Sequence, residues 1–249
     1  MCITIAVLGA AFGSFFNVLI HRIPNKQSII FPSSHCASCN KSIPFYQNIP
    51  IVSYIILRGK CSKCGASIHW HHLLVEIITP ILFVGLFLRY GLHDVLFFKY
   101  LLLFSFLIPI FFIDAFHNII PHVLSIPLIV IGLLTSILPG NNVGLIESAI
   151  TAIAIFCFLL LLAWAYQKAR GAEGLGGGDI WLLTGIATFF GLQGMPFIFI
   201  IAASMGIIYF LVFIRDKDKE FAFGTFIAAA TVLWVIVGAD TILGLLHLN

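Results

Sequence analysis

Two aspartates stand where long apolar segments meet short polar ones. Asp114 follows Phe111-Phe112-Ile113 at the end of one apolar run, and Asp179 closes a Gly-rich stretch before another. A carboxylate at membrane depth is costly and usually has a function. Two carboxylates held close together cannot both ionise easily, so one keeps a proton and the pair can polarise a water against a peptide carbonyl. The sequence therefore predicts paired-acid catalysis of the aspartic-peptidase kind, if the fold brings the two residues together.

Each aspartate also has a simpler interpretation. Asp is favoured at the N-terminus of a helix, where Asp179 would lie. The C-terminal end of a helix disfavours an acid, so capping explains Asp114 less well. Membrane acids also serve proton or ion pathways, which would make the chain a proton-coupled transporter. A transporter would be expected to hold its acids near mid-bilayer, whereas these two stand at the ends of apolar segments.

Four of the six cysteines form two C-x-x-C pairs, Cys36/Cys39 and Cys61/Cys64. Two such pairs are typical of a closed, structural zinc site with four cysteine ligands. Zinc would stabilise a segment that is too small for a good hydrophobic core. A redox pair or four unligated thiols are the alternatives, and a membrane thiol oxidoreductase is the corresponding function. The other two cysteines lie in apolar runs, where we expect them to pack.

The composition defines the kind of protein that must position these groups. The chain has 249 residues, of which 61% are hydrophobic and 9% charged, whereas soluble domains carry about 25% charged residues. We therefore predict an all-α polytopic membrane protein with about eight transmembrane helices. A span needs roughly 20 apolar residues, and such runs fall at about 2–20, 73–90, 96–113, 123–139, 145–166, 180–194, 196–214 and 223–246. The sixth run is short, so it could form one bent unit with the seventh.

The basic residues predict the orientation. Most of the 13 Lys and Arg residues fall in the segments 21–72, 167–178 and 215–220. Eight spans place all three segments on one side, which the positive-inside rule identifies as the cytoplasm. Asp114 and Asp179 then lie at that same face of the membrane.

The chain divides into two expected parts. Residues 1–72 would form a first transmembrane helix and a cytoplasmic loop with the four-cysteine zinc site. Residues 73–249 would form a helical membrane bundle that carries the two acids. The first apolar run has no basic residue before it, so we expect a retained span rather than a cleaved signal.

Several motifs follow one another along the chain. Gly13-Ser-Phe-Phe-Asn-Val-Leu-Ile-His-Arg-Ile-Pro24 is followed by the two cysteine pairs, and then by Leu74-Val-Glu76, Ile113-Asp114, Ile120-Pro121 and Glu173-Gly-Leu-Gly-Gly-Gly-Asp179. This series resembles the type IV prepilin peptidases, the prepilin leader peptidase/N-methyltransferases, over nearly the whole chain. The last motif also contains the G-x-G-D signature that the family shares with other intramembrane aspartyl peptidases.

The resemblance implies a multi-pass enzyme of the bacterial inner membrane. It would cleave the leader of prepilins and pseudopilins after a glycine on the cytoplasmic side. It would then methylate the new N-terminus with S-adenosylmethionine. Its partners would be these substrates and the lipid bilayer, and no nucleic acid is expected. The resemblance implies Asp114 and Asp179 as the catalytic pair, beside a loop formed by Glu173, Gly174, Gly176 and Gly178.

The residues themselves give weaker evidence for methylation than for peptide cleavage. No Gly-rich dinucleotide-type motif follows a strand pattern. Asn17, Arg22 and Glu76 are candidates because of their positions in the motifs. Asn17 and Glu76 are also suited to hydrogen bonds between helices, and Arg22 to a positive-inside anchor.

The chain departs from the family pattern at three places. Trp181 stands where the family usually has a lysine, His71-His72 replace a Tyr-Pro or Arg-Pro type pair, and Ala222-Phe-Gly-Thr225 replaces P-F-G-P. Because a lysine would add positive charge near the acids, we expect peptidase activity with an altered pH optimum.

Overall fold

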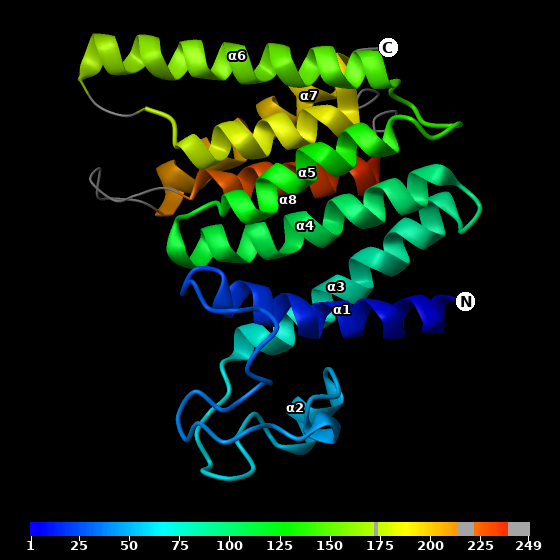
Figure 1. Ribbon diagram of the computed structural model, residues 1–249, viewed down its shortest axis with the longest axis vertical. Coiled ribbons are helices and arrows are strands. Elements are labelled where there is room, and N and C mark those ends of the chain that lie inside the picture. The colour runs from blue at the N-terminus through cyan, green and yellow to red at the C-terminus, as the bar shows by residue number, and fades with distance from the viewer. Residues whose placement is uncertain (172–173, 214–221, 239–249) are drawn as a thin grey trace. The chain divides into compact units, whose positions relative to one another are not determined.

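The computed structural model describes residues 1–171, 174–213 and 222–238, and these residues form helices and connecting segments without a β-strand. The helices are α1 (Cys2–Arg22), a 3-10 turn η1 (Phe45–Gln47), α2 (Val52–Ile56), α3 (Trp70–Tyr90), α4 (Val95–His117), α5 (His122–Thr135), α6 (Leu145–Arg170), α7 (Gly177–Phe213) and α8 (Phe223–Val237) (Figure 1). The predicted all-α class is confirmed.

The chain separates into two compact units, Met1–Gly91 and Leu92–Asn249, called unit 1 and unit 2 below. Unit 1 contains α1, the cysteine segment and α3, and unit 2 contains α4 to α8. The sequence places the division at residue 72, whereas α3 groups with unit 1 because it packs along α1.

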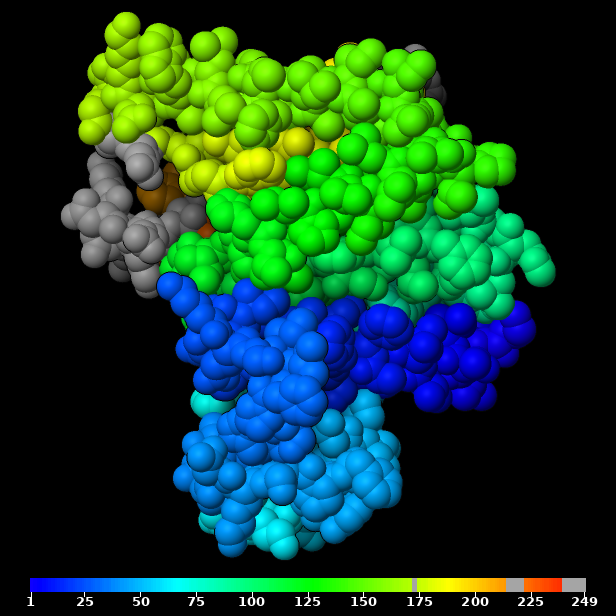
Figure 2. Space-filling model, in the orientation of Figure 1, coloured from blue at the N-terminus to red at the C-terminus, as the bar shows by residue number. Residues whose placement is uncertain are grey.

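Small residues bring α1 and α3 together in unit 1. A Cβ atom added to Gly13 would lie 2.9 Å from the Cα atom of Glu76 and 3.1 Å from the carbonyl oxygen of Val75. Gly9 meets the backbone of Pro80 in the same way. Membrane helices associate closely where glycine allows their backbones to approach, because lipid provides no hydrophobic drive between them. The cysteine segment connects these two helices and forms a lobe of its own (Figure 2).

Unit 2 is built around α7, which packs against α5, α6 and α8, while α4 packs against α8 and α5. Among the described residues, five helices are long and apolar enough to cross a membrane, namely α1, α3, α4, α6 and α7. The apolar helices α5 and α8 are shorter than a span in the part of the chain described. The eight predicted apolar runs therefore do not each form a separate long helix in the described residues. One reason is that the sixth and seventh runs form a single element, α7, with a bend.

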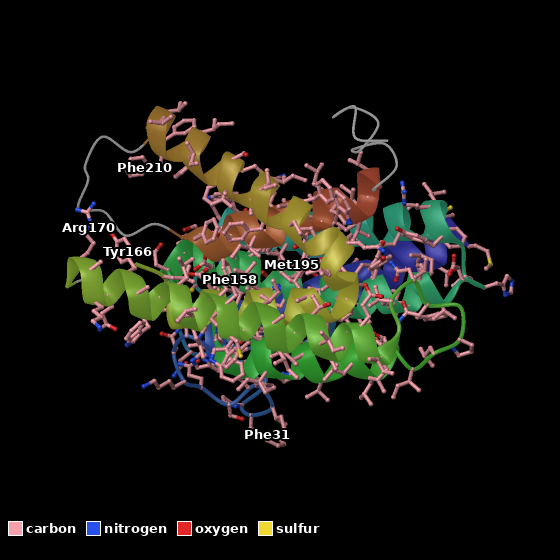
Figure 3. All side chains as sticks on the ribbon, turned by 90° about the horizontal axis from the view of Figure 1, so that it is seen from above. Phe31, Phe158, Tyr166, Arg170, Met195 and Phe210 are labelled. Atoms are coloured by element: carbon pink, nitrogen blue, oxygen red, sulfur yellow. The ribbon has the colours of Figure 1, made fainter. Side chains whose placement is uncertain are left out.

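The bend in α7 lies at Gly191, whose φ of 62° and ψ of −169° are non-helical. A break of this kind disturbs the backbone hydrogen bonds of the preceding turn, which must find other partners inside a membrane. The hydroxyl of Ser148 on α6 donates to the carbonyl of Thr188, at 2.8 Å. Beyond the bend, α7 carries Met195 and Phe210, and Phe210 lies at the same edge of unit 2 as Arg170 at the end of α6 (Figure 3).

One buried cation in unit 2 also has polar partners. Lys99 in the second turn of α4 has no exposed surface. Its ammonium group donates to the side-chain oxygens of Asn141 at 2.7 Å and Asn142 at 2.8 Å. These two asparagines lie between α5 and α6, so their bonds to Lys99 connect that loop to α4.

The contact between α5 and α7 gives a prediction about stability. A Cβ atom at Gly132 would collide with the hydroxyl of Thr188 and lie 2.8 Å from the ring of Phe189. Gly132→Ala should therefore destabilise the protein by about 1–3 kcal/mol, the usual cost of overpacking. Thermal unfolding in detergent measures the change. Gly144→Ala is the matched control, because nothing lies within 4 Å of its Cβ position. Equal unfolding temperatures for the two variants would contradict the prediction.

Candidate active site

Asp114 lies in the last turn of α4 and is only 3% exposed. The helix ends at Asn118, which adopts the left-handed conformation with φ 53°. The N–H of Asn118 donates to the carbonyl of Asp114 at 2.8 Å. Asparagine is one of the few residues that tolerate this C-terminal geometry. The sequence thus ends α4 one turn after the aspartate and leaves its carboxylate at the helix end.

The carboxylate of Asp114 contacts the start of α8. Its Oδ2 atom accepts a hydrogen bond from the backbone N–H of Thr225 at 2.6 Å and from the hydroxyl of Thr225 at 3.0 Å. A Cβ atom at Gly224 would lie 3.0 Å from the same oxygen, so glycine permits the approach. The N-terminus of a helix carries unpaired N–H groups and partial positive charge. These groups offset the unfavourable position of Asp114 at the end of its own helix.

Asp179 is the third residue of α7, which begins at Gly177. Its side chain is therefore in the first turn rather than at the N-cap position. The carboxylate folds back and accepts a hydrogen bond from the backbone N–H of Gly176. Asp179 thus also lies at a helix N-terminus, where negative charge is favoured. Its side chain is partly exposed.

The two aspartates meet in unit 2. The carboxyl groups of Asp114 and Asp179 are close enough to repel each other electrostatically. Ile120, in the turn between α4 and α5, lies against a neighbour of each: Gly178, which precedes Asp179, and Gly224, which faces the carboxylate of Asp114. A Cβ atom at Gly178 would be 2.8 Å from the Cβ atom of Ile120, and one at Gly224 would be 2.5 Å from its Cδ1 atom. The ends of α4, α7 and α8 therefore converge around one isoleucine and bring the predicted pair together.

Two of the glycines before Asp179 have close neighbours in the fold. A Cβ atom at Gly174 would collide with the ring of Tyr166 on α6, and one at Gly176 would lie 2.9 Å from the carboxylate of Asp179. Figure 3 shows Tyr166 at the end of α6 where this stretch begins. The space that these glycines provide is thus partly used by the protein itself. Glu173, the remaining residue predicted for this loop, lies outside the described residues.

The four predicted cysteines form a cluster in unit 1. Two similar turns carry them. In the first, the N–H of Cys36 donates to the carbonyl of Lys41, and in the second, that of Cys61 donates to Ala66. The residue after each C-x-x-C pair has positive φ, 57° at Asn40 and 71° at Gly65. These repeated turns direct all four thiols to one point, although the pairs are distant in sequence.

The geometry of the cluster suits a metal ion. The four sulfur atoms lie within 4.8 Å of one another, and those of Cys36 and Cys64 are 3.8 Å apart. Zn–S bonds of about 2.3 Å in a tetrahedron place sulfurs about 3.8 Å apart. Backbone N–H groups of Cys39 and Ser38 lower the pKa of Cys36 to about 6. The shift at Cys36 favours the thiolate, which is the form that binds metal, whereas burial and the neighbouring thiols raise the pKa of Cys64 to about 11.

The three methyltransferase candidates line one pocket of unit 1, with a volume of about 280 Å³. It is enclosed by α1, α3 and the cysteine segment. Asn17 is buried, and while its amide group donates to the carbonyl of His72 at 2.9 Å, its Oδ1 atom has no protein partner among the described residues. Glu76 accepts the backbone N–H of Ile51 at 2.7 Å. A buried polar atom without a partner is uncommon and indicates room for a ligand or water.

Arg22 has a structural role in the wall of this pocket. Its guanidinium donates to the carbonyl oxygens of Ser28 at 2.9 Å and Pro32 at 2.7 Å. These bonds hold the chain as it leaves α1. The positive-inside anchoring suggested for Arg22 stays a prediction.

The three departures from the family pattern have different surroundings. The ring of Trp181, on the second turn of α7, packs 5.1 Å from that of Phe156 and 6.1 Å from that of His122. The rings of His71 and His72 contact each other at the start of α3, with centroids 4.3 Å apart and planes tilted by 40°. Thr225 contacts Asp114 directly. The sequence shows that Thr225 replaces the second proline of P-F-G-P. It does not show that Thr225 forms hydrogen bonds with Asp114.

Two family models match the chain. The first, the bacterial peptidase A24 N-terminal domain, matches residues 7–90, and the second, the type IV leader peptidase family, matches residues 101–211. Their boundary coincides closely with that between unit 1 and unit 2. No solved structure matches the chain.

Curated relatives cover almost the entire chain. The chain is 32% identical to the prepilin leader peptidase/N-methyltransferase of Neisseria gonorrhoeae, over 94% of this chain and 89% of the relative. It is 34% identical to the protein of that name from Dichelobacter nodosus, over 92% and 88%, and 31% identical to that from Pseudomonas aeruginosa, over 92% and 88%. Two acids at converging helix ends of a membrane bundle are the arrangement that an aspartyl peptidase requires. The chain belongs to the type IV leader peptidase family.

Proposed function

We propose that this protein removes the leader peptides of prepilins and pseudopilins and methylates the N-terminus that cleavage exposes. The observation that carries the peptidase half is the meeting of Asp114 and Asp179 at the converging ends of α4, α7 and α8. The relatives named for both activities support the pairing of cleavage with methylation. A transporter and a thiol oxidoreductase find no support in these relatives.

In the proposed reaction the two carboxyl groups carry one proton between them, so one aspartate is ionised and the other protonated. The ionised aspartate takes a proton from a water, whose oxygen bonds to the carbonyl carbon of the last leader residue, the glycine. The protonated aspartate gives its proton to the carbonyl oxygen, and a tetrahedral diol forms. The C–N bond then breaks as the first aspartate passes its proton to the leaving nitrogen and the second recovers one from the diol. Both carboxyl groups end in their starting states, and no cofactor is consumed.

We further propose that the site faces the cytoplasm at the bacterial inner membrane. Lys168 and Arg170 lie at the end of α6, close in sequence to Asp179. Basic residues beside spans favour the cytoplasmic side. The leader of a substrate helix would reach the aspartates there, past Gly174, Gly176 and Gly178.

The acid pair is tested by replacing each member. Asp114→Asn and Asp179→Asn should each lower leader cleavage by roughly 10²–10⁴-fold, because neither can complete the proton exchange. The measurement is mass analysis of a synthetic prepilin incubated with each purified variant. Asp94→Asn is the control, because Asp94 only caps the opposite end of α4 by accepting the N–H of Leu96. Near-normal cleavage by either site variant, at normal membrane insertion, would exclude the pair.

The methyl donor would occupy the pocket of unit 1. When bound, S-adenosylmethionine supplies an activated methyl group. Pocket residues of this chain offer the polar groups that such a donor needs: the unpaired Oδ1 of Asn17 to accept a hydrogen bond, and the carboxylate of Glu76 to balance positive charge. The volume of about 280 Å³ is near the lower end of the usual range for small-molecule sites.

Asn17 separates the two activities. In the prepilin assay, Asn17→Ala should retain leader loss and reduce the methyl gain at least roughly tenfold, as expected when a hydrogen bond in a binding site is lost. The exposed Asn25, which bonds only to the carbonyl of His21 within the described contacts, provides the control Asn25→Ala. Wild-type methylation by Asn17→Ala would remove this pocket from consideration.

We propose that the cysteine cluster binds zinc as a structural ion. The purified protein should contain one zinc per chain by elemental analysis. Cys36→Ser or Cys61→Ser should lose most of it, because three thiolates do not close the coordination shell. Cys157→Ser is the control, since this exposed cysteine lies on α6 in unit 2 and is not one of the four clustered thiols. Zinc-free protein with reversible disulfides between the pairs would favour a redox role instead.

A further inference from the structure

Thr225 contributes two hydrogen bonds to a residue of the proposed acid pair. Its N–H and its hydroxyl reach the same carboxylate oxygen of Asp114, at 2.6 Å and 3.0 Å. Asp114 is almost fully buried, so water contributes little to solvating its charge. The two donors of Thr225 therefore supply a large part of the polar environment of this carboxylate.

The position of Thr225 in α8 strengthens the effect. It is the third residue of the helix, and the residue before the helix, Ala222, provides no side-chain cap. The N–H groups of the first turn lack partners within the helix, so a carboxylate from another helix can accept from them. Asp114 caps α8 in this way, and the helix dipole adds to the stabilisation of its negative charge.

Asp179 has a less favourable environment for charge. Its carboxylate accepts from the backbone N–H of Gly176, and the charge of Asp114 repels its own. When one proton is shared between two close carboxyl groups, it resides on the group whose charge is stabilised less. The hydrogen bonds from Thr225 thus place the proton on Asp179.

We propose that Thr225 is a positioning residue that keeps Asp114 ionised, so that Asp114 acts as the base toward water and Asp179 as the acid toward the carbonyl oxygen. This inference rests on the proposed peptidase function. It assigns different roles to two aspartates that the motif alone leaves equivalent. A purely structural role for Thr225, as the partner that joins α8 to α4, would affect stability and leave the proton distribution unchanged.

The test is the pH dependence of leader cleavage by Thr225→Val. Valine retains the shape and the backbone N–H but lacks the hydroxyl. Loss of a donor to a charged group should move the acid limb of the kcat/KM profile upward by roughly one pH unit, because Asp114 then needs a higher pH to ionise. Thr225→Ser restores the hydroxyl and should restore the wild-type profile. If Thr225→Val does not accumulate in the membrane, Thr225→Cys takes its place, and its weaker donor should give a smaller shift in the same direction.

Thr231→Val is the matched control. Thr231 is a buried threonine of the same helix, and its hydroxyl donates to the carbonyl of Ile227 at 2.8 Å, away from Asp114. This variant should keep the wild-type profile even if its stability falls. An acid limb that is the same in Thr225→Val and Thr231→Val would overturn the role of Thr225. If Asp114→Asn itself remained active, the proposed function would fail instead, so the two failures are distinguishable.

Discussion

The site depends on one physical constraint: a carboxylate buried in an apolar helical bundle needs partners that stabilise its charge. Asp114 lies near the C-terminal end of α4, where the dipole of its own helix opposes a negative charge. The start of α8 provides the compensating donors through Thr225. Because this bond joins α4 to α8, the same contact that makes the acid tolerable also determines where the two helices meet. The hydrogen bonds between Asp114 and Thr225 therefore serve both the proposed catalytic site and the packing of α4 against α8.

The same constraint explains where other polar groups lie in unit 2. Lys99 is fully buried, and its charge is bonded to two asparagine side chains at the end of α4 opposite Asp114. Near the bend of α7, Ser148 bonds to the carbonyl of Thr188. These polar contacts occur at helix ends and near a helix break, where backbone groups lack helical partners. In the middle of the helices, polar side chains such as those of Ser105 and Thr231 are hydroxyls that bond to their own helix.

The sequence predicts much of this arrangement because its signals are local. Hydropathy locates the apolar helices, the cysteine spacing indicates the cluster, and the acids stand out against apolar neighbours. The bond between Asp114 and Thr225 could not be predicted, since it joins residues far apart in the chain and threonine is common in helices. The end of α5 at Thr135 falls short of the expected 139, because an apolar run does not reveal where a helix ends. Of the residues predicted for the loop beside the aspartates, Gly174, Gly176 and Gly178 each face a neighbour in the fold, which the motif does not indicate.

Unit 1 shows how motif residues can act through backbone contacts. Arg22 of α1 bonds to carbonyls at the start of the cysteine segment, and Glu76 of α3 bonds to the N–H of Ile51 in its middle. Ile51 has a φ of 65°, which is costly for a β-branched residue and persists only where the surroundings impose it. The two helices therefore hold the segment at points that a metal ion at the cysteines would not reach. A metal would order the two cysteine turns. Arg22 and Glu76 instead hold the rest of the cysteine segment, which forms the pocket wall, next to α1 and α3. The shape of the pocket thus depends on charged side chains of the helices as well as on the cluster.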